Sequence, residues 1–411
     1  MNGANMKTVA VIGGGAAGCI AAVRLSAEKD IKVILFEKQQ RILRKVSATG
    51  NGRCNLTNTM GSSCNYHGTD AVFAEEALGK YPAEYIISLF RSLGLVTVEE
   101  YGGRIYPLSN SANSVVDVLR YYLESGKTEI RTSCEVLGLK KKNGGFSIQT
   151  AEKEFFADAV IYACGSAAGE KLGGSMRAYK PLQELGLKLI APVPSLVQLI
   201  SDSPYPKTLK GVKAEAVISV KGSSEAMSSG ELLFTDRGIS GPAAFDISRP
   251  VSAMLHEGNK PVLQVDMAPG IGFSDITDIL RARIQNTPEL PVSELFTGVV
   301  HNRLGRMLVK YAGLDGNAAL KSLVRDDIKK AVSALKSFEL RITATEGFGN
   351  AQVAAGGIAT ASFNPATMEC RAIPGLYVCG EVLDIDGDCG GHNLQWAWAS
   401  GLAAADSVIA L

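Results

Sequence analysis

The first apolar residues of the chain form two short runs, with a glycine-rich turn and a helix-compatible segment between them. Thr8 to Ile12 is the first run, Val33 to Phe36 is the second, and the apolar segment Cys19 to Ala27 lies between them. Short continuous apolar runs are typical of buried strands in α/β proteins. The pattern predicts a strand–turn–helix–strand unit, the opening of an α/β sheet.

The next part of the chain alternates between helical and strand patterns. Residues 71–98 and 114–124 carry apolar residues at helical spacing. Strands are predicted over residues 130–139, 145–150 and 155–157, and within 158–166, where the strand ends in Ala163-Cys164-Gly165. The middle two are expected to pair around a polar turn in a short antiparallel meander, which is more typical of FAD-binding proteins than of NAD-dependent dehydrogenases.

The pattern changes twice more towards the C-terminus. Residues 192–267 contain β-like segments punctuated by proline and glycine, whereas 273–337 has helical spacing. Residues 345–411 then provide a strand and a helix that the first part needs to complete its sheet. We predict a discontinuous Rossmann-like domain of 1–191 and 345–411, a β-barrel domain of 192–272 and 337–344, and a helical insertion of 273–336.

Glycines occupy the turn after the first strand in the pattern G-x-G-x-x-G, at Gly13, Gly15 and Gly18. The first glycine allows the tight turn, the second lets the backbone approach a pyrophosphate, and the third lets the helix pack close to the strand. The helix N-terminus at Ala16 and Ala17 presents free N–H groups to the phosphates. The turn therefore predicts a dinucleotide site.

An acidic residue closes the second strand. Glu37 follows the turn by roughly the expected ~20 residues, so its carboxylate can take the ribose hydroxyls, and Lys38 lies beside it. An acid at this position favours an unphosphorylated adenosine ribose, as in FAD or NAD.

The polar loop 39–58 that follows carries several cations among glycines. Cations and exposed N–H groups suit a pyrophosphate and the edge of an isoalloxazine, and a solvated surface loop is the alternative. Cys54 is interpreted as a packing residue and not a nucleophile, because no histidine is near it in sequence. The candidate cofactor residues of this loop are Lys45, Asn51, Arg53, Cys54 and Asn55.

Two later strand ends are predicted to approach the same cofactor. Cys164-Gly165 follows a predicted strand, and Gly380-Glu381 puts an acid where FAD proteins hold a ribitol hydroxyl. A helix that opens at Gly390-Gly391 can stabilise negative charge on a reduced flavin. The candidate cofactor residues here are Val136, Cys164, Gly165, Gly380, Glu381, Asn393, Leu394 and Gln395.

Composition narrows the class of partner. Lys+Arg 42 against Asp+Glu 41 gives a net charge of +1, so neither nucleic acid nor an anionic membrane is expected as the main partner. The apolar stretch Val9–Val23 is glycine-rich and too short to span a bilayer, and we expect a cytoplasmic protein with a small-molecule substrate. The eight cysteines contain no C-x-x-C pair, so no metal site is predicted.

Four motifs give the chain a resemblance to a known family. The motifs are TGNGRCNLTN at 49–58, GRIYP at 103–107, FTDRGISGPA at 234–243, and GLYVCGEVLDIDGDCGGHNLQWAWASG at 375–401. In this order, over essentially the whole chain, they resemble the BaiN-like flavoproteins, also called the aminoacetone-oxidase-like FAD family. The resemblance implies FAD, a Rossmann-like domain, a β-barrel and a small helical domain. It also implies that Arg53, Cys54, Asn55, Glu381, Asn393 and Gln395 lie near the FAD.

The resemblance implies two activities. One is NAD(P)H-driven reduction of a C=C bond conjugated to a ketone, of the bile-acid or steroid type, and the other is oxidation of a small primary amine such as aminoacetone by oxygen. The chain has no second G-x-G-x-x-G, so NAD(P)H would bind transiently. We favour the reductase, while a non-catalytic FAD-binding sensor is a third hypothesis.

The acid–base residue of such a flavin site is expected near the last helix. His392 is the first candidate, because its unperturbed pKa lies near working pH and it starts that helix. A hydrogen-bonded role at the helix start is the alternative, and Tyr106 and Asp236 are second candidates. The family more often has histidine at position 236 and an aromatic residue at position 392, so the substrate of this chain can differ from that of a relative.

Overall fold

The computed structural model describes residues 6–126, 128–223 and 226–410, and these fall into two compact units. Unit 1 comprises Met1–Pro192 with Gln352–Leu411, and unit 2 comprises Val193–Ala351. The chain therefore leaves unit 1, forms unit 2, and returns. Each unit has its own sheet system and is described separately.

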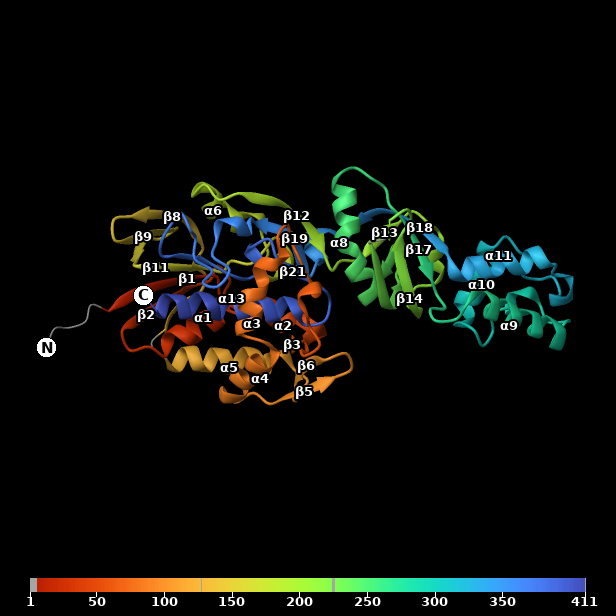
Figure 1. Cartoon of the computed structure of the whole chain (residues 1–411), viewed down its shortest axis with the longest axis horizontal. Helices are drawn as coiled ribbons and strands as arrows, with labels where there is room; N and C mark the ends of the chain where they lie inside the picture. The colour runs from red at the N-terminus through yellow and green to blue at the C-terminus, as the bar shows by residue number, and fades with distance from the viewer. Residues whose placement is uncertain (1–5, 127, 224–225, 411) are drawn as a thin grey trace. The chain divides into compact units, whose positions relative to one another are not determined.

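Unit 1 is organised around a parallel sheet of five strands in the order β20-β11-β1-β2-β7. The strands are β1 (Lys7–Ile12), β2 (Ile31–Phe36), β7 (Thr128–Arg131), β11 (Ala159–Tyr162) and β20 (Leu376–Val378). All neighbours pair in parallel, and β20 joins from the C-terminal part of the chain. The predicted Rossmann-like sheet is confirmed (Figure 1).

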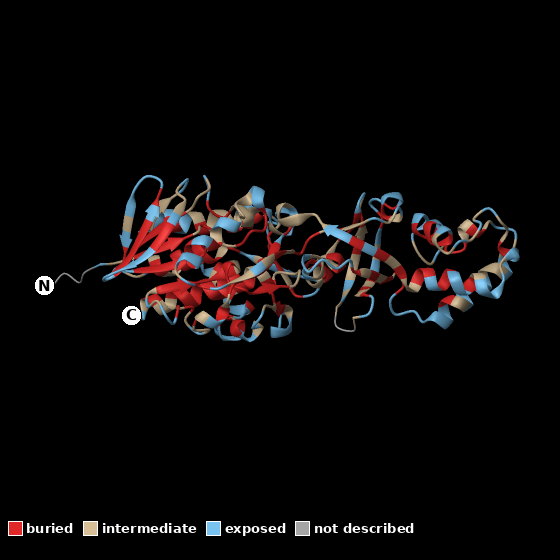
Figure 2. Cartoon of the chain, turned by 90° about the horizontal axis from the view of Figure 1, so that it is seen from above, coloured by how far each residue is buried: buried red, intermediate tan, exposed pale blue. Residues whose placement is uncertain are grey.

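Two mostly buried helices pack on one face of this sheet. They are α1 (Ala16–Ser26) and α13 (His392–Ile409), which lie against each other. A Cβ atom on Gly401 would lie 2.5 Å from the carbonyl oxygen of Ala17, so the two helix backbones approach as closely as glycine permits. Most residues of both helices are buried (Figure 2).

A three-stranded antiparallel meander packs against β1 and β11. Its strands are β8 (Val136–Lys142), β9 (Gly145–Thr150) and β10 (Glu154–Ala157). The prediction of one strand over 130–139 was wrong, because the chain turns between β7 and β8. Ser133 has φ +53°, and its N–H donates to the carbonyl of Gln39, which turns the chain out of the parallel sheet. A continuous β-like pattern does not reveal such a turn.

The prediction that 71–98 is helical is confirmed only in part. The segment forms α3 (Glu75–Lys80) and α4 (Ala83–Ser92), followed by a strand, β5 (Thr97–Glu100). The break falls at Tyr81-Pro82, because proline has no N–H to continue the ladder and disfavours a helical residue before it. The freed carbonyl of Tyr81 instead accepts a hydrogen bond of 2.7 Å from the Gln395 side chain.

Two small antiparallel sheets complete the part of unit 1 that carries the candidate site. One has the order β3-β6-β5, with β3 (Thr57–Asn58) and β6 (Arg104–Pro107), and the other pairs β4 (Tyr66–His67) with β21 (Asp386–Gly387). The remaining elements are α2 (Arg44–Ala48), α5 (Ala112–Ser125), α6 (Lys180–Glu184), β12 (Leu189–Ser195) and β19 (Val353–Ile358).

Unit 2 contains the predicted barrel, which is closed in the order β13-β16-β15-β14-β17-β18. Its strands are β13 (Leu199–Ser201), β14 (Lys213–Val220), β15 (Met227–Phe234), β16 (Gly238–Ser240), β17 (Val262–Asp266) and β18 (Phe338–Thr345). Its helices are α7 (Tyr205–Thr208), α8 (Pro242–His256), α9 (Phe273–Asn286), α10 (Asn302–Tyr311), α11 (Arg325–Lys336) and α12 (Gly347–Asn350). Helix α8 begins at Pro242, which fits the first turn of a helix.

One apolar core joins the barrel strands of unit 2 to helices α9–α11. Leu263 of the barrel and Leu304 and Val332 of the helices belong to the same buried cluster. Across this boundary the ring of Phe338 meets that of Tyr311 edge to face, with centroids 4.7 Å apart. The helical segment therefore shares its core with the barrel, and its independence as a third domain stays a prediction.

Replacing Phe338 tests this shared core. Phe338→Ala removes a fully buried ring and should destabilise the protein by about 3–5 kcal/mol, measured by urea unfolding with circular dichroism. Phe273→Ala is the matched control, because Phe273 is exposed and its loss should stay within about 0.5 kcal/mol. Equal, small effects of both substitutions would contradict a common core.

Candidate functional site

The glycine turn after β1 has the shape of a dinucleotide cradle. Gly13 has φ +110°, and a Cβ atom on Gly18 would lie 1.9 Å from the carbonyl oxygen of Gly13. A Cβ atom on Gly15 would meet nothing within 4 Å. The turn is therefore closed by backbone contacts behind Gly13 and Gly18 and open in front of Gly15, as a bound pyrophosphate requires.

The start of α1 adds unpaired backbone donors to this cradle. Gly15 is the N-cap and makes no side-chain cap, and the first helical hydrogen bond runs from the N–H of Cys19 to Gly15. The N–H groups of Ala16 and Ala17 precede it, and such groups favour an anion at the helix start. Open space, free donors and a partial positive charge fit a pyrophosphate.

Glu37 is held by the backbone of the same turn. Its carboxylate accepts hydrogen bonds from the N–H of Gly14 at 2.8 Å and of Gln39 at 2.7 Å. Each carboxylate oxygen has a further acceptor position, so ribose hydroxyls can still bind. Beside it lies a solvent-open pocket of about 650 Å³, lined by Lys38, Gln39, Gln40, Arg41, Arg44 and Ser133.

The end of β11 touches the turn from the other side. The carbonyl of Ala163 lies against Gly13, and the thiol of Cys164 donates to the carbonyl of Ile12 at 3.4 Å. Burial raises the pKa of the Cys164 thiol to about 12, and Gly165 has φ +68° with open space beside it. Val136 begins β8 in the neighbouring meander.

Glu381 is the centre of a second polar cluster. Its carboxylate accepts from Lys45 Nζ at 2.7 Å and from Ser166 Oγ at 2.6 Å, and the N–H of Ala354 donates at 3.0 Å. Gly380 before it has φ +75° and accepts a hydrogen bond from the indole of Trp396. The structure thus joins two predicted cofactor residues, Lys45 and Glu381, from segments far apart in sequence.

The loop 49–58 places its predicted residues in different environments. Cys54 is buried with φ +61°, and burial raises the pKa of its thiol to about 12, which favours a packing role. The Arg53 guanidinium contacts Glu100 and Asn110. Asn51 is exposed and left-handed, with φ +55°. The Oδ1 of Asn55 is buried without a hydrogen-bond partner.

The predicted side chains at the start of α13 mostly bind the protein itself. Gln395 accepts from Thr57 Oγ1 at 2.6 Å, and its amide also holds the carbonyl of Tyr81. Asn393 makes two hydrogen bonds with the backbone of Gly387, at 2.9 and 2.7 Å. Leu394 is half-buried in the same turn. These side chains fix the helix start, which leaves its backbone N–H groups for a ligand.

His392 is the first residue of α13 and is 5% exposed. Its Nδ1 has no hydrogen-bond partner, and its ring meets that of Tyr66 edge to face at 5.8 Å. Burial lowers the pKa of His392, against the opposing charge of Asp388. His392 is therefore a neutral imidazole near pH 7, and its unpartnered Nδ1 is buried beside Gly61, where an added Cβ atom would lie 3.1 Å from it.

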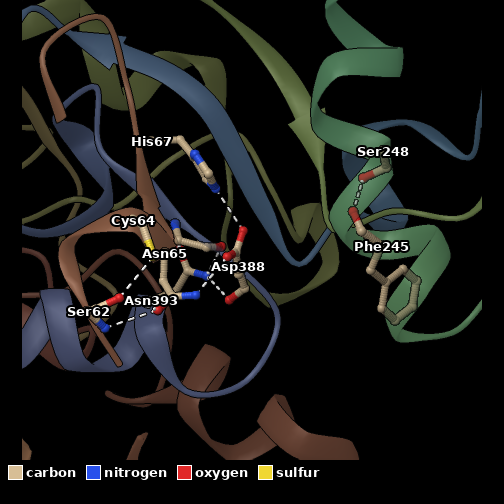
Figure 3. A network of polar contacts seen from close by, with 9 residues as sticks. Ser62, Cys64, Asn65, His67, Phe245, Ser248, Asp388 and Asn393 are labelled. Atoms are coloured by element: carbon tan, nitrogen blue, oxygen red, sulfur yellow. Dashed lines mark hydrogen bonds and ion pairs between the residues drawn. The ribbon is translucent and has the colours of Figure 1, made fainter. Parts of the chain in front are cut away.

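A second histidine, His67, lies in this region, and it was not predicted as a site residue from the sequence. Asp388 accepts from His67 Nε2 at 2.7 Å and from Asn65 Nδ2 at 3.0 Å (Figure 3). Burial alone would raise the pKa of the Asp388 carboxyl, but the hydrogen bonds from His67 and Asn65 hold it below its usual range. No sequence motif marks this network, because it depends on the pairing of the two-residue strands β4 and β21.

Tyr106 and Asp236, the second candidates for acid–base chemistry, lie in different units. Tyr106 of β6 is 8% exposed under the Arg53 guanidinium, 4.1 Å from the ring centroid, and burial raises the pKa of its hydroxyl. Asp236 is an exposed residue of unit 2, where it pairs with Lys210 at 2.6 Å. Its place beside a flavin stays a prediction. Among the described residues, no group of three or more metal-ligating side chains could hold a metal ion.

Filling the space in front of Gly15 should remove FAD without unfolding the chain. Gly15 has φ −82°, which valine accepts, and its added side chain would occupy only the open cradle. Gly15→Val should therefore purify without absorbance at 450 nm and melt near the temperature of the FAD-free wild type. Gly79→Val, on the surface of α3, adds a side chain into open space elsewhere and should keep its FAD. A yellow Gly15→Val protein would refute the cradle.

The buried neutral imidazole also predicts how stability depends on pH. Unfolded His392 binds a proton near its ordinary pKa of about 6.5, but the folded protein binds it only at lower pH. The unfolded state therefore binds more protons below that value, and the free energy of unfolding should fall as pH decreases from about 7.5 to about 5.5. His392→Gln should flatten this dependence in urea titrations, and His256→Gln, an exposed control, should not. A slope unchanged by His392→Gln would contradict the assignment.

Comparison with known proteins places this site in a family. The model of the HI0933-like protein Rossmann domain matches residues 7–407. A 3-dehydro-bile acid delta(4,6)-reductase of Clostridium scindens is 37% identical over 97% of this chain and 98% of its own length. Ribosomal RNA dihydrouridine synthases of Escherichia coli and Haemophilus influenzae are 30% and 28% identical, each over 97% of both chains.

These relatives bear on the expected partners. Two of them are named for a reaction on ribosomal RNA, so the expectation of no nucleic-acid partner stays a prediction. In the described part of the chain, no helix combines the length and apolarity needed to cross a bilayer. The resemblance predicted from the four motifs is confirmed over nearly the whole chain. The chain belongs to the HI0933-like Rossmann family and is an FAD-dependent oxidoreductase.

Proposed function

We propose that the protein reduces a carbon–carbon double bond conjugated to a carbonyl group, with a steroid of the bile-acid type as substrate and NAD(P)H as electron donor. One observation carries the proposal: the bile-acid reductase is 37% identical over almost the full length of both chains. At that coverage the relative shares the barrel and helical segments as well as the cradle.

The other relatives support the same reaction class on a different substrate. A 3-dehydro-bile acid with a 4,6-diene has its double bonds conjugated to the C3 ketone, and uridine has its C5=C6 bond conjugated to the C4 carbonyl. Both named reactions add a hydride and a proton across such a bond. The reaction class is therefore common to the relatives, whereas the substrate is not.

The residues of unit 1 suit this chemistry. Bound FAD, once reduced, supplies the hydride. Lys45 and Glu381 hold each other where the sequence predicts the ribitol chain, and the start of α13 offers N–H groups and a partial positive charge. His392 is a neutral imidazole at the first position of this helix, so its ring can donate or relay a proton by hydrogen bonding.

Charge favours a small substrate over ribosomal RNA. RNA-binding proteins neutralise phosphates with clustered Lys and Arg, so their domains are usually basic. Here Lys+Arg 42 nearly equal Asp+Glu 41. The higher identity to the bile-acid reductase points the same way. Uridine of ribosomal RNA is the second candidate substrate, supported by two relatives.

Anaerobic stopped-flow absorbance separates these functions. FAD-loaded protein is mixed with NADH or NADPH while flavin bleaching is followed, and the reduced protein is then mixed with 3-oxo-4-cholenoic acid. The proposal expects rapid bleaching, followed by reoxidation and a saturated 3-oxo product. Reoxidation by 23S rRNA but not by the steroid would replace the substrate. Bleaching by aminoacetone and not by a nicotinamide would replace the reaction with amine oxidation, and no reaction with any of them would favour the sensor hypothesis.

Substitution of His392 tests the proton-donating group. His392→Phe keeps a ring of similar size beside Tyr66, so FAD content should change little, but turnover of the steroid should fall by roughly 100-fold or more. Bleaching by the nicotinamide should be retained, because that half-reaction needs no proton from this residue. His256→Phe is the control on the surface of unit 2. Unchanged turnover would assign His392 a role in holding the helix start only.

A further inference from the structure

The motif GRIYP at 103–107 contains a cation, Arg104, that is not among the residues predicted to bind FAD. Arg104 of β6 is half-buried, and its guanidinium has no hydrogen-bond or ion-pair partner among the described residues. A guanidinium is charged at every physiological pH, and its partial burial is costly unless an acceptor or anion compensates it. The guanidinium of Arg104 is therefore available to bind an anion or a polarised oxygen.

The acidic residue nearest in the sheet is already engaged. Glu100 of β5 lies directly opposite Arg104 in the antiparallel ladder, where a cross-strand ion pair would be expected. The carboxylate of Glu100 instead pairs with Arg53, whose guanidinium also contacts Asn110. Arg53 thus neutralises Glu100 and leaves the charge of Arg104 available.

The face of the sheet that carries Arg104 is turned towards His392. Asn58 pairs with Arg104 in register, and Tyr106 is two residues further along β6, so all three side chains leave the sheet on one face. Asn58 donates from Nδ2 to the carbonyls of Gly102 at 3.1 Å and Gly390 at 2.9 Å. A Cβ atom on Gly390 would lie 3.6 Å from Nε2 of His392.

Two polar groups without protein partners therefore lie on this face. They are the Arg104 guanidinium and the Tyr106 hydroxyl, neither of which has a hydrogen-bond partner among the described residues. Arg104 is close enough to Tyr106 and to His392 for its charge to lower the pKa of each. A cation and a neutral phenol together suit one oxygen that becomes negative.

We propose that Arg104, assisted by the Tyr106 hydroxyl, binds the carbonyl oxygen of the substrate and stabilises the negative charge that forms there during reduction. The inference rests on the proposed function. Hydride addition at the β-carbon moves the π-electron pair onto this oxygen as an enolate, and a proton added at the α-carbon restores the carbonyl. The alkene gains two electrons and two hydrogens, and the reduced cofactor supplies the electron pair.

A phenol ligand tests the role of Arg104 without the natural substrate. A phenolate oxygen has the charge of the enolate, and a phenolate stacked on oxidised flavin gives a charge-transfer band above 500 nm. Wild-type, FAD-loaded protein titrated with 4-chlorophenol should show this band. Arg104→Met should weaken binding at least tenfold and remove the band, and should lower kcat with 3-oxo-4-cholenoic acid by roughly 10²–10³-fold.

Two further variants serve as controls for this test. Arg91→Met makes the same change at an exposed arginine of α4 and should bind phenol and turn over like the wild type. Arg104→Lys keeps the charge but loses the planar donor fork, so it should retain the band with weaker affinity and an intermediate kcat. If Arg104→Met does not bind FAD, the affinity for 4-chlorophenol and the kcat of Arg104→Lys test the inference instead.

The outcomes separate this inference from the function on which it rests. A wild type that reduces the steroid, with Arg104 variants unchanged in band and kcat, would overturn the inference and leave the function intact. A wild type that reduces no conjugated ketone would overturn the proposed function. In that case a charge-transfer band lost in Arg104→Met would still show Arg104 as an anion site, and an unaffected band would overturn both.

Discussion

The architecture of unit 1 depends on backbones that approach more closely than a Cβ atom allows. A side chain on Gly18 would overlap the carbonyl of Gly13, and one on Gly401 would overlap that of Ala17. These contacts press α1 against the glycine turn and α13 against α1, so the starts of the two helices are set by the same steric constraint. The cradle in front of Gly15 is the space that this packing leaves open.

A set of long-range hydrogen bonds then fixes the start of α13. Gln395 joins this helix to Thr57 and to the helix break at Tyr81, and Asn58 joins the small sheet to Gly390. Of these residues, Gln395 was predicted as a cofactor ligand. In the structure they bond protein groups, and this satisfies buried polar atoms while holding His392 in place.

The sequence predicted those parts of the fold that follow from local pattern. The glycine turn and its flanking strands have a fixed spacing, and proline at position 242 marks the start of α8. The breaks at Pro82 and Ser133 were missed, because apolar periodicity continued across them. The pairing of His67 with Asp388 and the register of Arg104 with Glu100 could not be predicted, since both depend on short strands brought together by the tertiary fold.

The residues of the candidate site were also predicted only in part. Motif spacing pointed to Glu37, Glu381 and His392, but not to their partners. Tyr106 was a second candidate for acid–base chemistry, but Arg104 in the same motif was assigned no role. Only the structure shows that Arg53 pairs with the nearby carboxylate of Glu100, which leaves Arg104 without that partner. Which charges remain unpaired is a property of the fold and not of the sequence.

The most direct test of the central claim is a crystal structure of the FAD-loaded protein with 3-oxo-4-cholenoic acid. We predict a pyrophosphate in front of Gly15 and an isoalloxazine at the start of α13. We also predict the steroid carbonyl oxygen within hydrogen-bonding distance of Arg104 or Tyr106. A flavin bound elsewhere, or a steroid whose carbonyl faces away from β6, would contradict that claim.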